Sequence, residues 1–363
     1  MTPFFSLIAA VPVAALLSLL PPAAIAQDPQ DSYDLYSFDD SPRDEPLAYP
    51  DWFKESFLYL DDDLQEALKT GKRGLMVYFG QKRCVYCYKL MEVNFGLADI
   101  AEYTRRHFDV VPLDIWSVEE VTGLDGEVTT SREYSLKTGT NFTPSIIFYD
   151  AEGREALRLR GYYPPYQFRA ALEFVADGHY RRESFRQYLA RGEGRMVFEP
   201  GDLNEEDFFA APPFNLDRRR LPSDRPLAVF FEQGDCHACD VLHGEALREP
   251  EIYRLFDRLD LVQLDMWAET PVVTPGGERT TARGWAESLG LFYAPSIIFF
   301  DEKGGEILRL DSVVRFHRLH NVLDYVLSRA YLTEPNFQSW RVMHANRALR
   351  PTPGELVEIH PRD

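Results

Sequence analysis

The sequence predicts two tandem α/β domains, each built on a central mixed sheet flanked by helices. Three observations support this fold class. A Cys-x-x-Cys motif occurs twice, at residues 84–87 and 236–239. Each motif follows a compact apolar run typical of a buried strand and opens a segment with apolar residues at helical spacing. Strands and helices then alternate in the same order after both motifs.

An internal repeat supports the tandem arrangement. Residues 111–116 correspond to residues 262–267, and residues 144–148 recur as residues 295–299, both at one constant offset. Independent coincidences at a fixed spacing are improbable, and the period is a whole domain. The repeat therefore indicates two similar folds rather than a solenoid.

The order of elements is clearest in the first repeat. A hairpin turn is expected at Glu152-Gly153, and Gly139 is placed to end a short helix. The pattern predicts a helix at 64–69, a strand at 75–79, a helix from Cys84, a strand at 109–115, a helix at about 131–138, strands at 145–149 and 155–160, and a helix at 166–176.

The N-terminus resembles an export signal. Residues 1–26 carry no charged side chain, are largely apolar, and end in the small-x-small sequence Ala24-Ile25-Ala26. An uncleaved membrane anchor is the alternative, although three prolines interrupt the apolar run. We expect cleavage after Ala26, no membrane insertion afterwards, and a periplasmic or secreted location, where thiol chemistry is directed towards disulfides.

Composition sets the remaining boundaries. Residues 27–49 are acidic and turn-rich, which predicts a flexible arm. Residues 336–363 are expected to form a C-terminal tail that is loosely ordered from Arg350 to Asp363. The domains are expected at 50–191 and 224–335, with a linker at 192–223. Three aromatic residues of this linker are too apolar for a free tether and are expected to dock on a domain: Phe208, Phe209 and Phe214.

The net charge argues against one class of partner. The chain carries 58 acidic and 39 basic side chains, for a formal charge of -19, so phosphate backbones would be repelled and no nucleic-acid partner is expected. All 4 cysteines lie in the two motifs. A zinc site formed by both pairs is the alternative, but the gap between them far exceeds that of a zinc ribbon.

A Cys-x-x-Cys pair between a strand and a helix is typical of a redox dithiol. The first sulfur is expected at the helix N-terminus, where unpaired N–H groups and the macrodipole favour a thiolate. Disulfide exchange needs an accessible thiolate to attack and a second thiol to resolve the mixed disulfide. We therefore expect Cys84 and Cys236 to attack, Cys87 and Cys239 to resolve, and no cofactor beyond these redox-active disulfides.

The residues beside the attacking cysteines differ between the repeats. Lowering a thiol pKa from about 8.5 to about 7 takes roughly 2 kcal/mol, more than the ~0.3–1 kcal/mol that a helix terminus gives. Lys82 and Arg83 would supply the remainder in the first repeat. In the second repeat Asp235 opposes ionisation, whereas His237 favours it when protonated. The two sites are therefore expected to differ in reduction potential.

A proline leads the third strand of each repeat. Thr143-Pro144 and Ala294-Pro295 each precede an apolar run. A strand-leading proline is otherwise a tolerated edge feature. In this context the sequence favours cis X–Pro bonds held opposite the dithiols.

In this order of elements the chain resembles the thioredoxin-like superfamily, twice. The first repeat resembles periplasmic thioredoxin-related proteins of the SoxW type. The shared motifs are Trp52-Phe53-Lys54, Gly71-Lys72, the first Cys-x-x-Cys, Leu113-Asp114-Ile115-Trp116, Thr143-Pro144, Asp150 with Gly153, and Gly161-Tyr162 with Pro165 and Phe168. The resemblance is close over residues 50–180 and looser over 223–331.

The resemblance implies a thiol–disulfide oxidoreductase that reduces or exchanges protein disulfides with an unidentified thiol–disulfide electron donor or acceptor. It also implies that the cis-proline loop grips an extended substrate. The residues expected to bind substrate are Tyr86, Thr143, Pro144, His237, Ala294 and Pro295.

The sequence departs from the family in two respects. Arg83 or Asp235 precedes the first cysteine where cytosolic thioredoxins have tryptophan, and Tyr78 and Phe230 replace the buried acid that assists the resolving thiol. Three rival functions remain open. They are a disulfide oxidase or isomerase, a relay between the two repeats, and a peptide-binding scaffold whose disulfides only stabilise.

Overall fold

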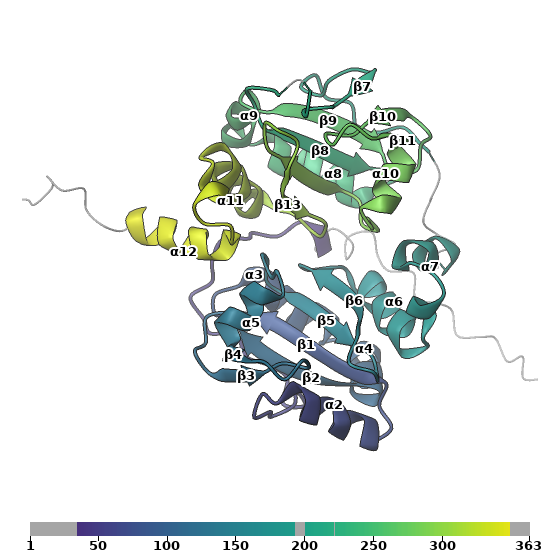
Figure 1. Cartoon of the computed structure of the whole chain (residues 1–363), viewed down its shortest axis with the longest axis vertical. Coiled ribbons are helices and arrows are strands. Elements are labelled where there is room, and N and C mark those ends of the chain that lie inside the picture. Colours follow the sequence, from purple (N-terminus) through teal and green to yellow (C-terminus); the bar gives the residue numbers. More distant parts are fainter. Residues whose placement is uncertain (1–34, 193–199, 221, 349–363) are drawn as a thin grey trace, which may run out of the picture.

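The computed structural model describes residues 35–192, 200–220 and 222–348, with side chains to residue 344. Two α/β domains lie one above the other, the first coloured purple to teal and the second green to yellow (Figure 1). This confirms the predicted fold class of two tandem domains with mixed sheets. The proposed signal segment 1–26, with its cleavage site, lies outside the described residues.

The sheet of the first domain has four strands in the order β2-β1-β5-β6. Strand β1 is central and buried along its whole length, because helices cover both faces of the sheet; this explains its continuous apolar sequence. Val77 pairs with Val111 of the parallel β2 and with Ile147 of the antiparallel β5. The strands are β1 Gly74–Gly80, β2 Phe108–Asp114, β5 Ser145–Tyr149 and β6 Glu155–Arg160, with a separate hairpin of β3 Glu120–Thr122 and β4 Val128–Thr130.

The helices of this domain follow local sequence signals. Thr130 and Glu133 form a capping box that begins α5, because each side chain bonds the other residue's backbone N–H. The sequence prediction missed the hairpin and the helix α4. The helices are α2 Leu60–Lys69, α3 Val85–Lys89 continued by a π-helical turn at Leu90–Asn94, α4 Ala98–His107, α5 Ser131–Lys137, α6 Pro165–Ala176 and α7 Phe185–Gly192.

The second domain repeats this arrangement with the strand order β13-β12-β8-β9. Val229 of β8 pairs with Val262 and Ile298, as Val77 does with its partners in the first domain. The main strands are β8 Leu227–Glu232, β9 Asp260–Asp265, β12 Ser296–Phe300 and β13 Glu306–Leu310, beside a small sheet of β7 Phe214–Asn215, β10 Pro271–Val273 and β11 Arg279–Thr281. The helices are α8 His237–Gly244, α9 Pro250–Phe256, α10 Ala282–Ser288, α11 Phe316–Leu327 and α12 Phe337–Ala348.

Residues 35–49 do not form the free arm that the sequence suggested. Tyr36 and Asp40 are buried, and Phe38 packs edge-on against Tyr86, with 5.3 Å between ring centroids. The backbone carbonyl of Phe38 also accepts a hydrogen bond from Arg315 of the second domain. We call residues 35–49 the strap, because they contact both domains. Acidic composition misled the prediction, since the carboxylate of Asp40 is satisfied by groups far away in the sequence.

Residues 337–348 of the expected C-terminal tail form helix α12, and the segment 350–363, expected to be loosely ordered, lies outside the described residues. Phe337 packs against Phe142 of the first domain at 5.1 Å between ring centroids. In the linker, Phe208 and Phe209 dock on the second domain and Phe214 lies in β7, as expected for these aromatic residues.

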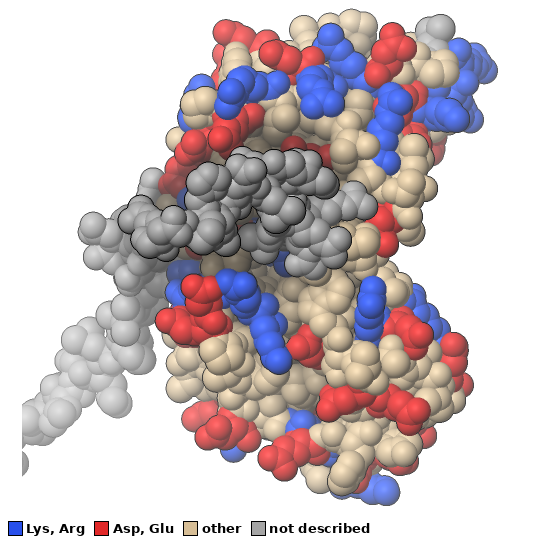
Figure 2. Space-filling model, turned by 90° about the vertical axis from the view of Figure 1, so that its left-hand side faces the viewer, with Lys and Arg blue, Asp and Glu red and all other residues tan. Residues whose placement is uncertain are grey.

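The two domains meet through equivalent loops. Val313 donates its backbone N–H to the carbonyl of Tyr162 at 3.1 Å, and Gly161 lies against Ser312, its counterpart in the other repeat. The next pair of counterparts, Arg160 and Asp311, forms an ion pair at 3.3 Å. The repeats therefore pack with approximate two-fold equivalence at this contact. Figure 2 shows acidic and basic side chains interspersed over both domains on one face.

Candidate functional site

The first dithiol lies where β1 is followed by α3. Cys84 is the N-cap of α3 and forms a disulfide with Cys87. The backbone N–H of Cys87 points at the sulfur of Cys84, with 3.1 Å between nitrogen and sulfur. An N–H group in this position stabilises negative charge on the sulfur once the disulfide is reduced.

The second dithiol has the same construction. Cys236 caps α8 and forms a disulfide with Cys239, whose N–H lies 3.1 Å from the Cys236 sulfur. That sulfur is also 3.7 Å from the carbonyl oxygen of Ala294. The structure therefore places both predicted attacking cysteines at helix N-termini.

The residues before the two motifs share one backbone shape but carry opposite charges. Arg83 and Asp235 both have a left-handed backbone, with φ of 65° and 48°. Arg83 forms an ion pair with Asp44 of the strap, which neutralises part of the charge of Arg83. Lys82 is exposed and lines a groove beside the first dithiol, and Asp235 is exposed. Their influence on the thiols stays a prediction.

The two proline loops match the sequence prediction. The Thr143–Pro144 and Ala294–Pro295 peptide bonds are both cis. The Thr143 hydroxyl accepts a hydrogen bond of 2.7 Å from Gln81, whose side-chain oxygen accepts one of 2.8 Å from Trp116. Trp267 donates in the same way to Gln233 at 2.9 Å, so this tryptophan–glutamine contact is repeated in both domains.

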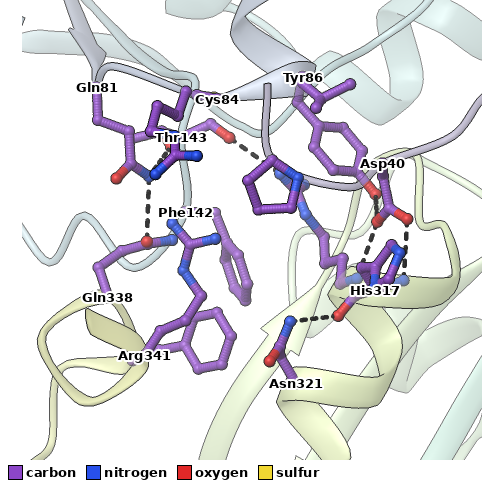
Figure 3. A pocket seen from close by; sticks show the side chains of 15 residues that line it. Asp40, Gln81, Cys84, Tyr86, Phe142, Thr143, His317, Asn321, Gln338 and Arg341 are labelled. Atoms are coloured by element: carbon purple, nitrogen blue, oxygen red, sulfur yellow. Dashed lines mark hydrogen bonds between the residues drawn. The ribbon is translucent and has the colours of Figure 1, made fainter. Parts of the chain in front are cut away.

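The expected accessibility of the attacking cysteines is wrong for this structure. Cys84 is 7% exposed and Cys236 is 9% exposed. The first dithiol faces a pocket of about 90 Å³ whose far wall comes from α11 and α12 of the second domain (Figure 3). Sequence reasoning missed this closure, because each motif was considered within its own domain.

Two residues expected to bind substrate contact the strap. Tyr86 is buried; its hydroxyl donates to Asp40 at 2.8 Å, and the Arg318 guanidinium lies 3.4 Å from its ring centroid. Burial, reinforced by the charge of Asp40, raises the pKa of Tyr86 well above its ordinary value. His237 meets Tyr36 edge-on at 5.6 Å between ring centroids. The strap therefore contacts one side chain between the cysteines of each motif; Tyr86 is buried, whereas His237 stays exposed.

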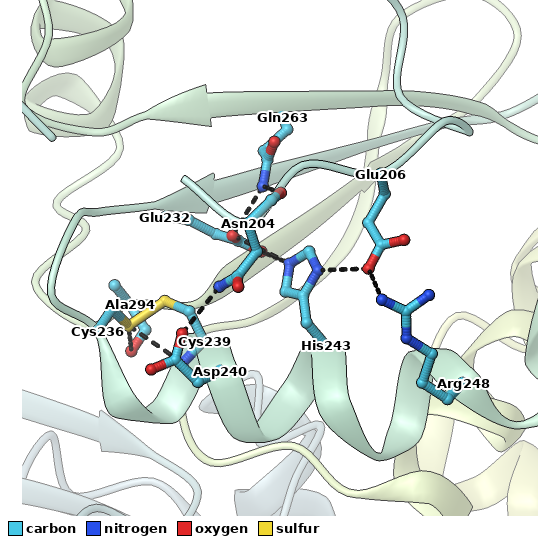
Figure 4. A network of polar contacts seen from close by, with 10 residues as sticks. All are labelled: Asn204, Glu206, Glu232, Cys236, Cys239, Asp240, His243, Arg248, Gln263 and Ala294. Atoms are coloured by element: carbon cyan, nitrogen blue, oxygen red, sulfur yellow. Dashed lines mark hydrogen bonds and ion pairs between the residues drawn. A yellow bond between two sulfur atoms is a disulfide. The ribbon is translucent and has the colours of Figure 1, made fainter. Parts of the chain in front are cut away.

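The second domain contains a buried polar network that sequence reasoning missed (Figure 4). His243, one turn after Cys239 on α8, contacts Glu232 at 2.9 Å through one ring nitrogen and Glu206 at 3.2 Å through the other. Burial lowers the pKa of His243, but the hydrogen bond and charge of Glu232, followed by those of Glu206, outweigh burial and raise it. A glutamate ending the otherwise apolar run of β8 was the available signal.

A four-stranded mixed sheet, a Cys-x-x-Cys disulfide at a helix start and a cis-proline loop together define a class of α/β dithiol domains. This chain contains two of them. The family model described as a thioredoxin-like domain matches residues 60–176 and 220–327, and the chain belongs to this family. The finer resemblance to SoxW-type proteins stays a prediction.

Several solved structures are similar to parts of the chain. A thioredoxin-fold protein from Helicobacter pylori is 22% identical, with 39% of this chain and 91% of that chain covered and a TM-score of 0.32. A thioredoxin from Thermus thermophilus is 20% identical, with 38% and 95% covered and a TM-score of 0.28. The oxidised DsbD C-terminal domain of Neisseria meningitidis is 15% identical, with 28% and 81% covered and a TM-score of 0.23.

No curated protein matches the chain. Within the described part of the chain, no helix has both the length and the apolar character needed to cross a membrane.

Proposed function

We propose that this chain is a periplasmic thiol–disulfide oxidoreductase that reduces or exchanges protein disulfides. One observation carries the proposal. Each Cys-x-x-Cys disulfide lies at a helix N-terminus with a backbone N–H directed at the sulfur of its first cysteine. Such a position favours the thiolate, which is the reactive form in exchange.

The chemistry of one cycle follows from this geometry. In the reduced protein, the Cys84 thiolate attacks one sulfur of a substrate disulfide, and the other substrate sulfur leaves as a thiolate. Cys87 then attacks the Cys84 sulfur, which releases the second substrate thiolate and forms the Cys84–Cys87 disulfide. The substrate gains two electrons, and two external thiol groups must return two electrons to the protein. The same steps apply to Cys236 and Cys239.

Closure of the domains adds a requirement for protein substrates. Both attacking cysteines are buried, the pocket beside Cys84 is walled by the second domain, and the strap contacts Tyr86 and His237. A protein disulfide therefore reaches Cys84 only after the strap and the second domain move away from the first motif. The Pro144 and Pro295 loops would then be free to bind an extended substrate.

Reduction of a model disulfide protein by the full chain tests the proposal. Cys84→Ser and Cys236→Ser should each lower the rate, and the double variant should abolish it. Activity like that of the wild type in the double variant would refute the proposed function. Reduction potentials of the two dithiols, measured in chains that keep only one of them, would distinguish a reductase from an oxidase. Similar potentials, with no exchange between the two dithiols, would exclude a relay.

Burial of the disulfides favours a second candidate, a peptide-binding scaffold in which they only stabilise the fold. Trapping separates the two functions. With Cys87→Ser or Cys239→Ser, an oxidoreductase accumulates mixed disulfides between its first cysteine and partner proteins, because the resolving thiol is absent. A scaffold would accumulate none.

A further inference from the structure

The pocket beside Cys84 is rich in cationic side chains. Its walls include Asp40 of the strap, Arg83 and Thr143 of the first domain, and Arg318 and Arg341 of the second. Figure 3 shows Arg341 extending from α12 towards the side of the pocket formed by Gln81 and Thr143. Three arginines but only one carboxylate thus line the pocket, in a chain whose formal charge is -19.

The one carboxylate in the pocket is already occupied. Asp40 accepts hydrogen bonds from the backbone N–H groups of His317 and Arg318 at 2.9 and 2.8 Å and from the hydroxyl of Tyr86. Arg83 is paired with Asp44 outside the pocket. Arg318 lies near the charge of Asp40 and donates through Nη2 to the carbonyl of Thr143 at 2.9 Å. The two cations of the interior, Arg318 and Arg341, therefore share a single carboxylate.

Hydrogen bonding leads to the same conclusion. Nη1 of Arg318 and Nε of Arg341 are buried without a hydrogen-bond partner in the described structure. Arg341 forms no ion pair with a described residue, and burial together with the charge of Arg318 lowers its pKa to about 10. Buried cations and N–H groups are costly unless they are paired, so this arrangement calls for an anion.

We propose that this pocket binds the carboxylate of a small thiol, and that such a thiol is the electron donor of the first dithiol. A guanidinium matches the planar geometry of a carboxylate, and Cys84 lines the same pocket. A pocket of about 90 Å³ admits a short acidic thiol while the domains stay closed. This inference rests on the proposed function only in taking Cys84–Cys87 as a disulfide that exchanges with thiols.

The electron balance needs two molecules of the donor. A first thiolate attacks the Cys84 sulfur, the Cys84–Cys87 bond breaks, and its electron pair leaves on Cys87. A second thiolate attacks the donor sulfur of the mixed disulfide, which forms the donor's own disulfide and releases Cys84 as a thiolate. Two thiols are oxidised, one protein disulfide is reduced, and the protons pass to the solvent and the cysteines.

The experiment compares three thiols that differ in charge: anionic 3-mercaptopropionate, neutral 2-mercaptoethanol and cationic cysteamine. They reduce the oxidised full chain, with Cys236→Ser and Cys239→Ser leaving only the first disulfide, and rates are expressed per thiolate. We expect the anionic thiol to react about tenfold faster than the neutral one, which corresponds to roughly 1.4 kcal/mol from one charge-assisted hydrogen bond. Cysteamine should be the slowest.

Arg341→Gln should bring the ratio of anionic to neutral rates close to one, and Arg341→Lys should restore part of the preference. The matched control is Arg105→Gln, which removes an exposed arginine of α4 and should keep the ratio. Equal rates for the anionic and neutral thiols, or a ratio unchanged by Arg341→Gln, would overturn the inference while leaving the proposed function intact. A native chain that none of the three thiols reduces would overturn both.

Discussion

Replacing Asp40 with alanine should expose the first disulfide while both domains stay folded. The Asp40 carboxylate joins three parts of the chain. It lies on the strap, accepts a hydrogen bond from Tyr86 inside the first motif, and accepts two from the first turn of α11 in the second domain. Asp40 is 8% exposed, so water does not replace these partners while the domains are closed.

The magnitude follows from the bonds that are lost. A hydrogen bond to a charged group contributes roughly 1.5–3 kcal/mol, and removing a helix N-cap costs about 0.5–2 kcal/mol. These contributions overlap at one carboxylate, and the released groups become hydrated on opening, so we expect a net loss of about 2–3 kcal/mol from the closed state. An opening equilibrium shifted by that amount exposes the disulfide roughly 30- to 150-fold more often.

The assay is the rate at which neutral dithiothreitol reduces Cys84–Cys87 in native buffer, with Cys236→Ser and Cys239→Ser removing the second disulfide. Asp39→Ala is the matched control, because Asp39 is exposed and its carboxylate bonds the neighbouring Ser41. Far-UV circular dichroism verifies that both variants stay folded. Equal reduction rates in folded Asp40→Ala and Asp39→Ala would refute the idea that Asp40 holds the pocket closed.

Three further predictions concern the stability of the domain contact and of the second domain. Gly161→Ala should lower the free energy of unfolding in urea by about 2–4 kcal/mol, because the φ of Gly161 is +115° and a Cβ would lie 2.0 Å from the Ser312 hydroxyl. In the control Gly126→Ala, which is also at positive φ but in open space, the loss should be only about 1 kcal/mol. Arg186→Ala should lower the free energy of unfolding by about 2–4 kcal/mol, because the Arg186 guanidinium lies 3.5 Å from the Trp267 ring centroid and donates to two backbone carbonyls of the second domain. A loss no larger than that of the exposed Arg181→Ala would contradict this role. His243, whose pKa is raised in the folded state, should contribute stability that is fully present below pH 6.5 and is lost as pH rises through its folded-state pKa; this part of the pH dependence of unfolding should vanish in His243→Gln.

Local patterns were sufficient to predict much of each domain. The sequence predicts strands at 145–149 and 155–160, and the structure has β5 and β6 at these bounds. The sequence also predicts a helix start at each motif and two cis prolines, and the structure has all of them. These features depend on contacts within one repeat, which apolar spacing and fixed motifs report well.

Features that depend on contacts between residues far apart in the sequence could not be predicted from these local patterns. Helix α4 was missed because only Ile100 and Thr104 of its ten residues are buried, which leaves little apolar periodicity. Charged or mixed composition is typical of solvated segments, so the sequence predicts a free arm and a tail where the structure has the strap and α12. Nothing near Asp40 in the sequence indicates that its partners are the backbone N–H groups of residues 317 and 318.

The meeting of Arg160 with its counterpart Asp311 has a consequence for how copies of this chain associate. Two first domains brought together through the same loops would place arginine opposite arginine, and two second domains would place aspartate opposite aspartate. Only the unlike combination brings opposite charges together. Divergence at this one repeated position therefore favours contact of a first domain with a second domain over contact between two like domains.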